Sequence, residues 1–425
     1  MADFFTRLLR RIGQVVEPIV DPNAGDRRRR ETATAKHLEG VGASLSRLTR
    51  QVERITERVD NIDRRQVDDL KQAVSTLQLN TRRQTTLADR LVRATHDDHE
   101  HELVRERALR RVQQLARRGG PVLVGPWTGE VGFELLYWAP FVRWAVRKFR
   151  IDPARITLLS RGGTASWYGI DGARYLDVFE LYSAEEFRAR TSEAMKQRTL
   201  KLFDRTLIRR VAGSMGERPG LLHPAIMYAL FMPYWKQQAS RKRAEEFSEY
   251  ARITPPVITG LQLPREYVAV RFYFSDCFPD TPDNREVVRS VIRSLAVDTD
   301  VVLLGSGVRV DDHHDFEMPR SDRVHTVDHV MRPENNLAVQ TAVIGGAKAF
   351  FGTYGGFSYL APLCGVKTVA LYSRRTFFEY HMDFAQQLFD TVGGGSLTVI
   401  DAATRPLMRH LASRSASEPM PPAQR

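Results

Sequence analysis

The chain has 425 residues, 42% of them hydrophobic, which is enough for two or three structural units with at least one substantial core. Its two cysteines, Cys277 and Cys364, lie far apart without CxxC spacing; this argues against a disulfide framework or a zinc site and favours a reducing cytoplasm. The net charge of +12 suits nucleic acid, anionic lipid or phosphorylated substrates, but no helix-turn-helix, zinc-finger or RNA-recognition signature accompanies it, so we expect no nucleic-acid binding.

Residues 1–25 are predicted to form a basic amphipathic helix. Apolar side chains recur at three- and four-residue spacing between Phe4 and Ile19, with Arg7, Arg10 and Arg11 on other faces. Such a helix adsorbs to an anionic membrane surface or packs on the protein itself, and the sequence leaves both open. No apolar run reaches the ~18 residues that a spanning helix needs. We therefore expect a cytoplasmic protein, peripheral on the inner face of the membrane if the helix adsorbs.

Residues 26–118 are predicted to form a long helical arm. Its apolar positions alternate steps of three and four, as a coiled-coil seam requires: Leu45, Leu48, Val52, Ile55, Val59 and Ile62. This pattern favours a homo-oligomer formed through residues 36–116, and a single solvated helix is the alternative. Gly119, Gly120 and Pro121 then end the helix, because glycine and proline do not continue it.

The rest of the chain alternates strands with helices. Buried-looking strands are expected at 122–124, 156–160, 175–182, 267–274, 301–304, 324–327, 349–351 and 368–371, with helices at 133–149, after Ser183, and at 285–295, 336–344 and 377–388. The fold class is therefore α/β, with parallel sheets in two Rossmann-like lobes. We place the amino-terminal lobe at 119–264, the carboxyl-terminal lobe at 265–405 and a flexible tail at 406–425.

A glycine-rich loop follows the expected strand at 349–351. Its candidate ligand-binding residues are Gly352, Thr353, Gly355, Gly356 and Ser358. Glycines let the backbone approach a ligand, and Ser358 can cap a helix whose free amides attract phosphate. The loop therefore predicts a diphosphate site, and a capped turn without a ligand is the alternative.

Residues 352–372 resemble the carboxyl-lobe signature of GT-B glycosyltransferases, as in heptosyltransferase-like and fucosyltransferase-like enzymes, in which a Gly/Ser/Thr loop and a small-residue helix precede a strand. The resemblance extends by architecture over about residues 121–405. It implies that a nucleotide diphosphate sugar binds the carboxyl lobe and that a glycan or lipid-linked acceptor hydroxyl binds the amino lobe. It also implies that the enzyme needs no catalytic metal and no cofactor besides the donor.

Further donor-site candidates follow the other strands of the second lobe. In fucosyltransferase-like enzymes an arginine after the equivalent strand contacts the diphosphate, and Arg271 matches by position; an ion pair at a strand edge is the alternative. Asp276 ends the same segment. The remaining candidates are Gly305, Ser306 and Gly307, where the backbone can approach a nucleotide, and Asp328, which can meet the base and ribose.

The acceptor and the catalytic base are expected on the loop after the first strand. Trp127, Gly129 and Gly132 form this acceptor loop, with Glu130 in the turn. Inverting transfer needs a general base for the acceptor hydroxyl, so Glu130 is the first candidate and Glu134 the second. Helix capping is the alternative for both carboxylates. Trp127 can stack on a sugar, although core packing is commoner for tryptophan.

Two other functions share these features. A nucleotide-sugar epimerase also uses paired Rossmann-like lobes and would process the donor without an acceptor. A non-catalytic adaptor, in which the coiled coil accompanies a degenerate sugar-nucleotide fold, would bind no nucleotide. A glycosyltransferase acting in surface polysaccharide or glycoprotein assembly is the leading hypothesis.

Overall fold

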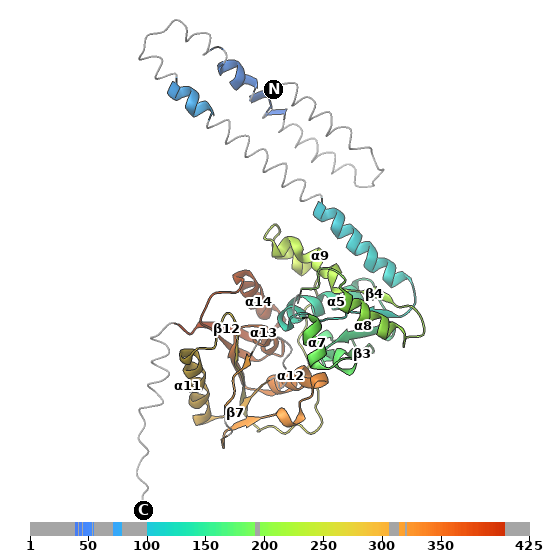
Figure 1. Ribbon diagram of the computed structural model, residues 1–425, viewed down its shortest axis with the longest axis vertical. Coiled ribbons are helices and arrows are strands. Elements are labelled where there is room, and N and C mark those ends of the chain that lie inside the picture. Colours follow the sequence, from blue (N-terminus) through green and yellow to red (C-terminus); the bar gives the residue numbers. More distant parts are fainter. Residues whose placement is uncertain are drawn as a thin grey trace, which may run out of the picture. The chain divides into compact units, whose positions relative to one another are not determined.

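A computed structural model describes residues 39–40, 42–44, 46–52, 54, 71–78, 100–191, 196–305, 314–318 and 321–403 (Figure 1). The chain divides into two compact units, Met1–His101 and Glu102–Arg425. The expected amphipathic helix, most of the coiled-coil seam and the tail from 406 lie outside the described residues. No helix in the described ranges is long and apolar enough to cross a membrane.

The first sheet of the second unit has four parallel strands in the order β3-β2-β1-β4. They are β1 (Val122–Val124), β2 (Ile156–Ser160), β3 (Arg174–Asp177) and β4 (Gly220–Leu222). Every residue of β1 and β2 is buried, including the polar Thr157 and Ser160 of β2, and the apolar run of β1 predicted this. Its helices and turns are α4 (Val131–Phe133), η1 (Glu134–Trp138), α5 (Ala139–Lys148), η2 (Pro153–Arg155), α6 (Ala165–Tyr168), η3 (Val178–Glu180), α7 (Ala184–Thr191), α8 (Leu202–Ala212), α9 (Pro224–Trp235) and α10 (Lys242–Glu246).

The second sheet has six parallel strands in the order β12-β11-β10-β5-β7-β9. They are β5 (Tyr267–Arg271), β7 (Asp300–Leu303), β9 (Val324–Thr326), β10 (Ala349–Thr353), β11 (Lys367–Tyr372) and β12 (Ser396–Asp401). The associated elements are α11 (Pro282–Asp298), η4 (Asp328–Val330), η5 (Pro333–Asn335), α12 (Asn336–Gly346), α13 (Gly356–Leu363) and α14 (Glu379–Val392). The α/β class with parallel sheets is thus observed directly.

Several elements differ from the sequence prediction. The expected helix at 133–149 begins at Val131 and contains a π-helical turn, η1, whose five residues are all buried. The expected strand at 267–274 breaks at Phe272, and its end, β6 (Tyr273–Phe274), pairs with β8 (His314–Asp315) in a separate antiparallel ribbon. The capping box at Ser183 is confirmed, since Glu186 and Ser183 exchange side-chain-to-backbone hydrogen bonds.

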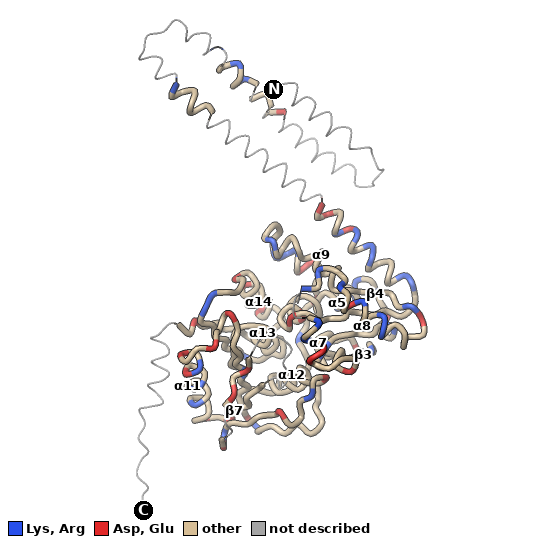
Figure 2. Tube along the Cα trace, viewed as in Figure 1, with Lys and Arg blue, Asp and Glu red and all other residues tan. Residues whose placement is uncertain are grey.

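The end of the predicted arm belongs to the α/β unit. In the helix through residues 100–117, Ala108, Val112 and Leu115 are buried in the core at helical spacing. Arg155 holds the end of the helix by donating to the carbonyl oxygens of Gly120 and Ala116 at 2.8 and 3.2 Å. Figure 2 shows Lys and Arg spaced along this helix. Its apolar stripe therefore packs inside the unit and is not part of a free seam.

Candidate active site

The candidate site residues follow the two strands at which strand order reverses. In the first sheet the chain runs β1, β2, β3 to one side and then places β4 on the other side of β1. In the second sheet it runs β5, β7, β9 and then places β10 on the other side of β5. Ligands of open α/β sheets bind beyond the carboxyl ends of strands at such points. Glu130 follows β1, and Arg271 ends β5 beside the loop after β10.

The loop after β1 touches the start of α13 through two glycines. A Cβ on Gly132 would lie 3.4 Å from the Cα of Gly356, and a Cβ on Gly356 would lie 2.8 Å from the backbone nitrogen of Gly132. The second distance is shorter than real Cβ contacts, so glycine is required at Gly356. This contact brings the Glu130 turn of the first sheet against the glycine-rich loop of the second sheet.

Gly356→Ala should lower the free energy of unfolding by about 1–3 kcal/mol, because the added methyl group meets Gly132 and Val131. Urea denaturation measures the loss. Gly213→Ala is the matched control, since its added Cβ would make only ordinary contacts at 3.6 Å and its φ of −62° suits alanine. If the two variants have the same free energy of unfolding, the contact between the loop after β1 and the start of α13 does not contribute to stability.

Glu134 is fully buried beneath the Glu130 turn. Its Oε1 accepts hydrogen bonds from Ser160 Oγ at 2.6 Å, Tyr168 OH at 2.7 Å and Thr164 Oγ1 at 3.2 Å. Burial raises the pKa of Glu134, opposed by the charge of Arg161 and by the three hydroxyl donors. The carboxylate has no exposed surface. This position favours support of the turn over proton transfer with an acceptor.

Two more buried charges hold the loops around Glu134. Arg161, 5% exposed, donates from Nη2 to the carbonyl oxygen of Gly129. Asp177 accepts from the Gly163 amide at 2.8 Å, and burial raises its pKa to about 6. Sequence patterns did not identify these partners, because they come from the ends of three different strands.

Glu130 lies on the surface at the N-cap of α4. Its charge acts on Tyr228, whose pKa is raised by burial and by Glu130 and is lowered by Arg198. Nearby, Lys196 lies 6.0 Å from the ring of Phe133. A solvent-accessible carboxylate at a helix start, beside aromatic rings and cations, can meet an acceptor hydroxyl.

His381 of α14 lies beside the same aromatic group. Its Nδ1 is 2.5 Å from the hydroxyl of Tyr137, and its ring centroid is 5.2 Å from that of Phe133. Burial and the charge of Lys196 lower the pKa of His381 to about 4, so its imidazole is neutral at pH 7. This pair was not predictable from the sequence, because it joins positions 244 residues apart.

Trp127 does not face an acceptor. Its ring is completely buried and stacks on Trp138 with centroids 5.9 Å apart. Trp167 is also completely buried, and its Nε1 donates to Thr341 Oγ1 of α12 at 2.9 Å. The expected sugar-stacking role of Trp127 is therefore corrected to core packing, while Gly129 and Gly132 remain in the loop beside α13.

Arg271 is enclosed at the end of β5, with 7% of its surface exposed. Its Nη1 donates to Gln340 Oε1, and its Nη2 lies 3.3 Å from Asp315 Oδ1. The guanidinium carbon lies 3.8 Å from the ring centroid of Phe357, in the first turn of α13. The alternative of an ion pair is thus present in this structure, and Gln340, Asp315 and Phe357 are neighbours that the sequence did not predict.

The other donor-site candidates differ in accessibility. Thr353 Oγ1 is buried, accepting from the Tyr273 amide at 3.0 Å and donating to its carbonyl oxygen at 2.8 Å. Ser358 is also buried, and its hydroxyl bonds to the backbone of Gly355, because α13 begins at Gly356 and Ser358 therefore lies in its first turn and not at its cap. Gly352 is buried, Gly355, Gly356 and Gly305 are partly exposed, Asp276 and Asp328 are exposed, and Ser306 and Gly307 lie outside the described residues.

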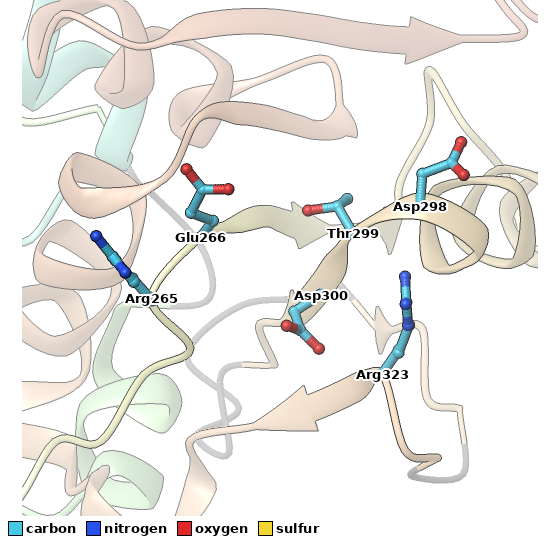
Figure 3. Close-up of a pocket in the computed structure, with 6 residues that line it drawn as sticks. All are labelled: Arg265, Glu266, Asp298, Thr299, Asp300 and Arg323. Carbon is cyan, nitrogen blue, oxygen red and sulfur yellow. The ribbon is translucent and has the colours of Figure 1, made fainter.

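A polar hollow of about 590 Å³ lies where the strands of the second sheet begin, at the opposite ends of the strands from the candidate site (Figure 3). It is lined by residues that precede β5, β7 and β9 or begin β7: Arg265, Glu266, Asp298, Thr299, Asp300 and Arg323. Its charged groups are engaged locally, as Arg323 donates to the Val297 carbonyl oxygen at 2.8 Å and Asp300 lies 3.0 Å from His325. The hollow is at the amino ends of the strands, away from the switch-point loops.

No family model and no curated protein matches the chain. Similar solved structures include E. coli ADP-heptose heptosyltransferase II, at 11% identity over 70% of this chain and 100% of that one, with a TM-score of 0.36. A family 9 glycosyltransferase from Veillonella parvula matches at 12% identity over 72% of this chain and 91% of that one, also with a TM-score of 0.36.

The iron-containing dodecameric glycosyltransferase TibC from enterotoxigenic E. coli matches at 13% identity, with a TM-score of 0.34. The match covers 59% of this chain and spans 59% of the length of TibC. These neighbours include heptosyltransferases, the kind of enzyme that the signature at 352–372 resembles. Their TM-scores lie below 0.5, so the proposals below rest on the residues of this chain.

Proposed function

We propose that this protein is a GT-B-type glycosyltransferase that moves a sugar from a nucleotide diphosphate sugar to an acceptor hydroxyl. The contact between Gly132 and Gly356 carries the proposal, because it joins an exposed carboxylate turn of one sheet to a helix start of the other. Arg271 lies beside that helix start, against Phe357. In this proposal the base and the anion-binding group lie on the two sides of the contact between Gly132 and Gly356, at the switch points of two parallel sheets.

In the proposed reaction Glu130 takes the proton of the acceptor hydroxyl. The acceptor oxygen forms a bond to the anomeric carbon as the bond from that carbon to the diphosphate oxygen breaks. The electron pair of the broken bond leaves with the diphosphate. Arg271 and the free amides at the start of α13 stabilise the negative charge of this leaving group.

The site divides into a donor side and an acceptor side. Gly355 and Gly356 allow the donor diphosphate close to the α13 backbone, and Asp328 follows β9 where it can reach the ribose. The acceptor, a glycan or lipid-linked sugar, binds beside Glu130, where Phe133 offers an apolar ring and Lys196 and Arg198 supply positive charge.

A thermal-shift screen tests donor binding on the full-length protein. UDP, GDP, ADP and dTDP sugars are compared, and we expect one nucleotide class to raise the melting temperature with increasing concentration, because a ligand of the folded state stabilises it by mass action. Absence of any shift up to millimolar nucleotide would favour the non-catalytic adaptor.

A further inference from the structure

Two buried hydrogen-bond donors beside Arg271 have no acceptor among the described residues. They are Arg271 Nε and Gln340 Nε2, on side chains that are 7% and 0% exposed. Leaving such a group unpaired destabilises the folded protein. Since Arg271 Nη1 already contacts Gln340 Oε1, the two open donors lie within one cluster. The cluster is therefore complete only with a further acceptor.

The cluster combines side chains from two helices with one from a short ribbon. Gln340 comes from α12 and Phe357 from α13, both packed in the core. Asp315 instead comes from β8, a strand of two residues that, among the residues the structure describes, pairs with β6 through Tyr273 and Phe274. Its side chain is 15% exposed, and its Oδ2 would lie 3.9 Å from a Cβ on Gly305, two residues after β7. The anionic partner of Arg271 thus lies on a short ribbon outside the six-stranded sheet.

We propose that Asp315 occupies an anion subsite made by Arg271 and Gln340, and that a ligand diphosphate displaces it. This inference rests on the proposed function, which assigns Arg271 to the donor. A phosphate group offers more acceptor oxygens than a carboxylate, so it can pair Arg271 Nη2 and also accept from Arg271 Nε and Gln340 Nε2. Asp315 therefore competes with the donor and favours diphosphates over weaker anions.

Asp315→Asn tests the competition, with inorganic pyrophosphate as the probe and the full-length protein in calorimetry. Removing the competing charge should tighten pyrophosphate binding about tenfold, whereas Gln340→Met should weaken it several-fold. Asp322→Asn is the matched control, because it removes one negative charge from an exposed position of the same lobe. Pyrophosphate binding by Asp315→Asn that is equal to or weaker than in the parent protein would overturn the proposal and make Asp315 a positioning residue.

Hydrogen exchange on the unmodified protein gives an answer even if Asp315→Asn fails to fold. The amide of Phe316 donates to the Phe272 carbonyl oxygen at 2.9 Å, beside the β6–β8 pair. Displacement of Asp315 should make this amide exchange faster when pyrophosphate is bound. Slower exchange there would contradict displacement.

Arg271→Ala separates this inference from the proposed function. If Arg271→Ala binds pyrophosphate as tightly as the parent protein, the donor site does not lie at β5. Weaker binding in Arg271→Ala without tighter binding in Asp315→Asn would leave the donor site in place and reject only the displacement.

Discussion

Glu130→Gln should keep nucleotide affinity while lowering turnover about 100-fold or more, the usual share of a general base. The amide preserves the size and hydrogen bonding of the side chain but cannot take the acceptor proton. The effect should fall on the transfer step alone, because Glu130 follows a strand of the first sheet and the donor is assigned to the loops of the second sheet. Turnover in a transfer assay and nucleotide affinity by calorimetry are measured on the same preparation.

Glu185→Gln is the control, since it makes the same change at an exposed position in the first turn of α7. If Glu130→Gln turns over at the rate of the parent protein, Glu130 is not the general base. Glu134 would not replace it without a large movement, because its carboxylate is fully buried under three hydroxyl donors.

Arg271→Ala should weaken nucleotide binding by about 1.5 to 3 kcal/mol, the contribution of a charge-assisted hydrogen bond. Turnover at saturating nucleotide should fall as well, because Arg271 also stabilises the leaving diphosphate. Calorimetry gives the affinity, and the melting temperature without ligand shows separately how far the loss of the pair with Asp315 lowers the stability of the folded protein.

Arg323→Ala provides a second arginine deletion in the same lobe, at the hollow of Figure 3. Its nucleotide affinity should equal that of the parent. If Arg323→Ala weakens nucleotide binding and Arg271→Ala does not, the nucleotide binds at the amino ends of the strands. The proposed site at their carboxyl ends would then be wrong.

The sequence predicted the elements that are long, apolar and regularly spaced. Strands β1, β2 and β5 were recognisable because they are buried on both faces and apolar residues predominate in them. β4 was not predicted, because its three residues, Gly220–Leu222, are too few to show a periodic pattern of hydrophobicity. β12 was not predicted, because only one of its six residues, Leu397, is buried and polar residues interrupt its apolar positions.

The candidate site was predictable in its loops but not in its contacts. Glycine patterns pointed to the turns at Gly132 and Gly356, and the structure brings these two turns together. The burial of individual side chains could not be predicted. Trp127 and Ser358 belong to loops whose residue types suit ligand binding, yet both side chains are buried. The neighbours of Arg271 were also hidden, because Asp315 and Gln340 are 44 and 69 residues away along the chain.

The most direct test is a transfer reaction with full-length protein, the nucleotide sugar selected by thermal shift, and a pool of surface glycans and lipid-linked sugars. Mass spectrometry follows both the acceptors and the released nucleotide. We predict release of a nucleoside diphosphate together with an acceptor heavier by one sugar residue, and loss of both products in Glu130→Gln. An isomerised nucleotide sugar with unchanged acceptors would instead identify an epimerase, and no change in any component would contradict an enzymatic function.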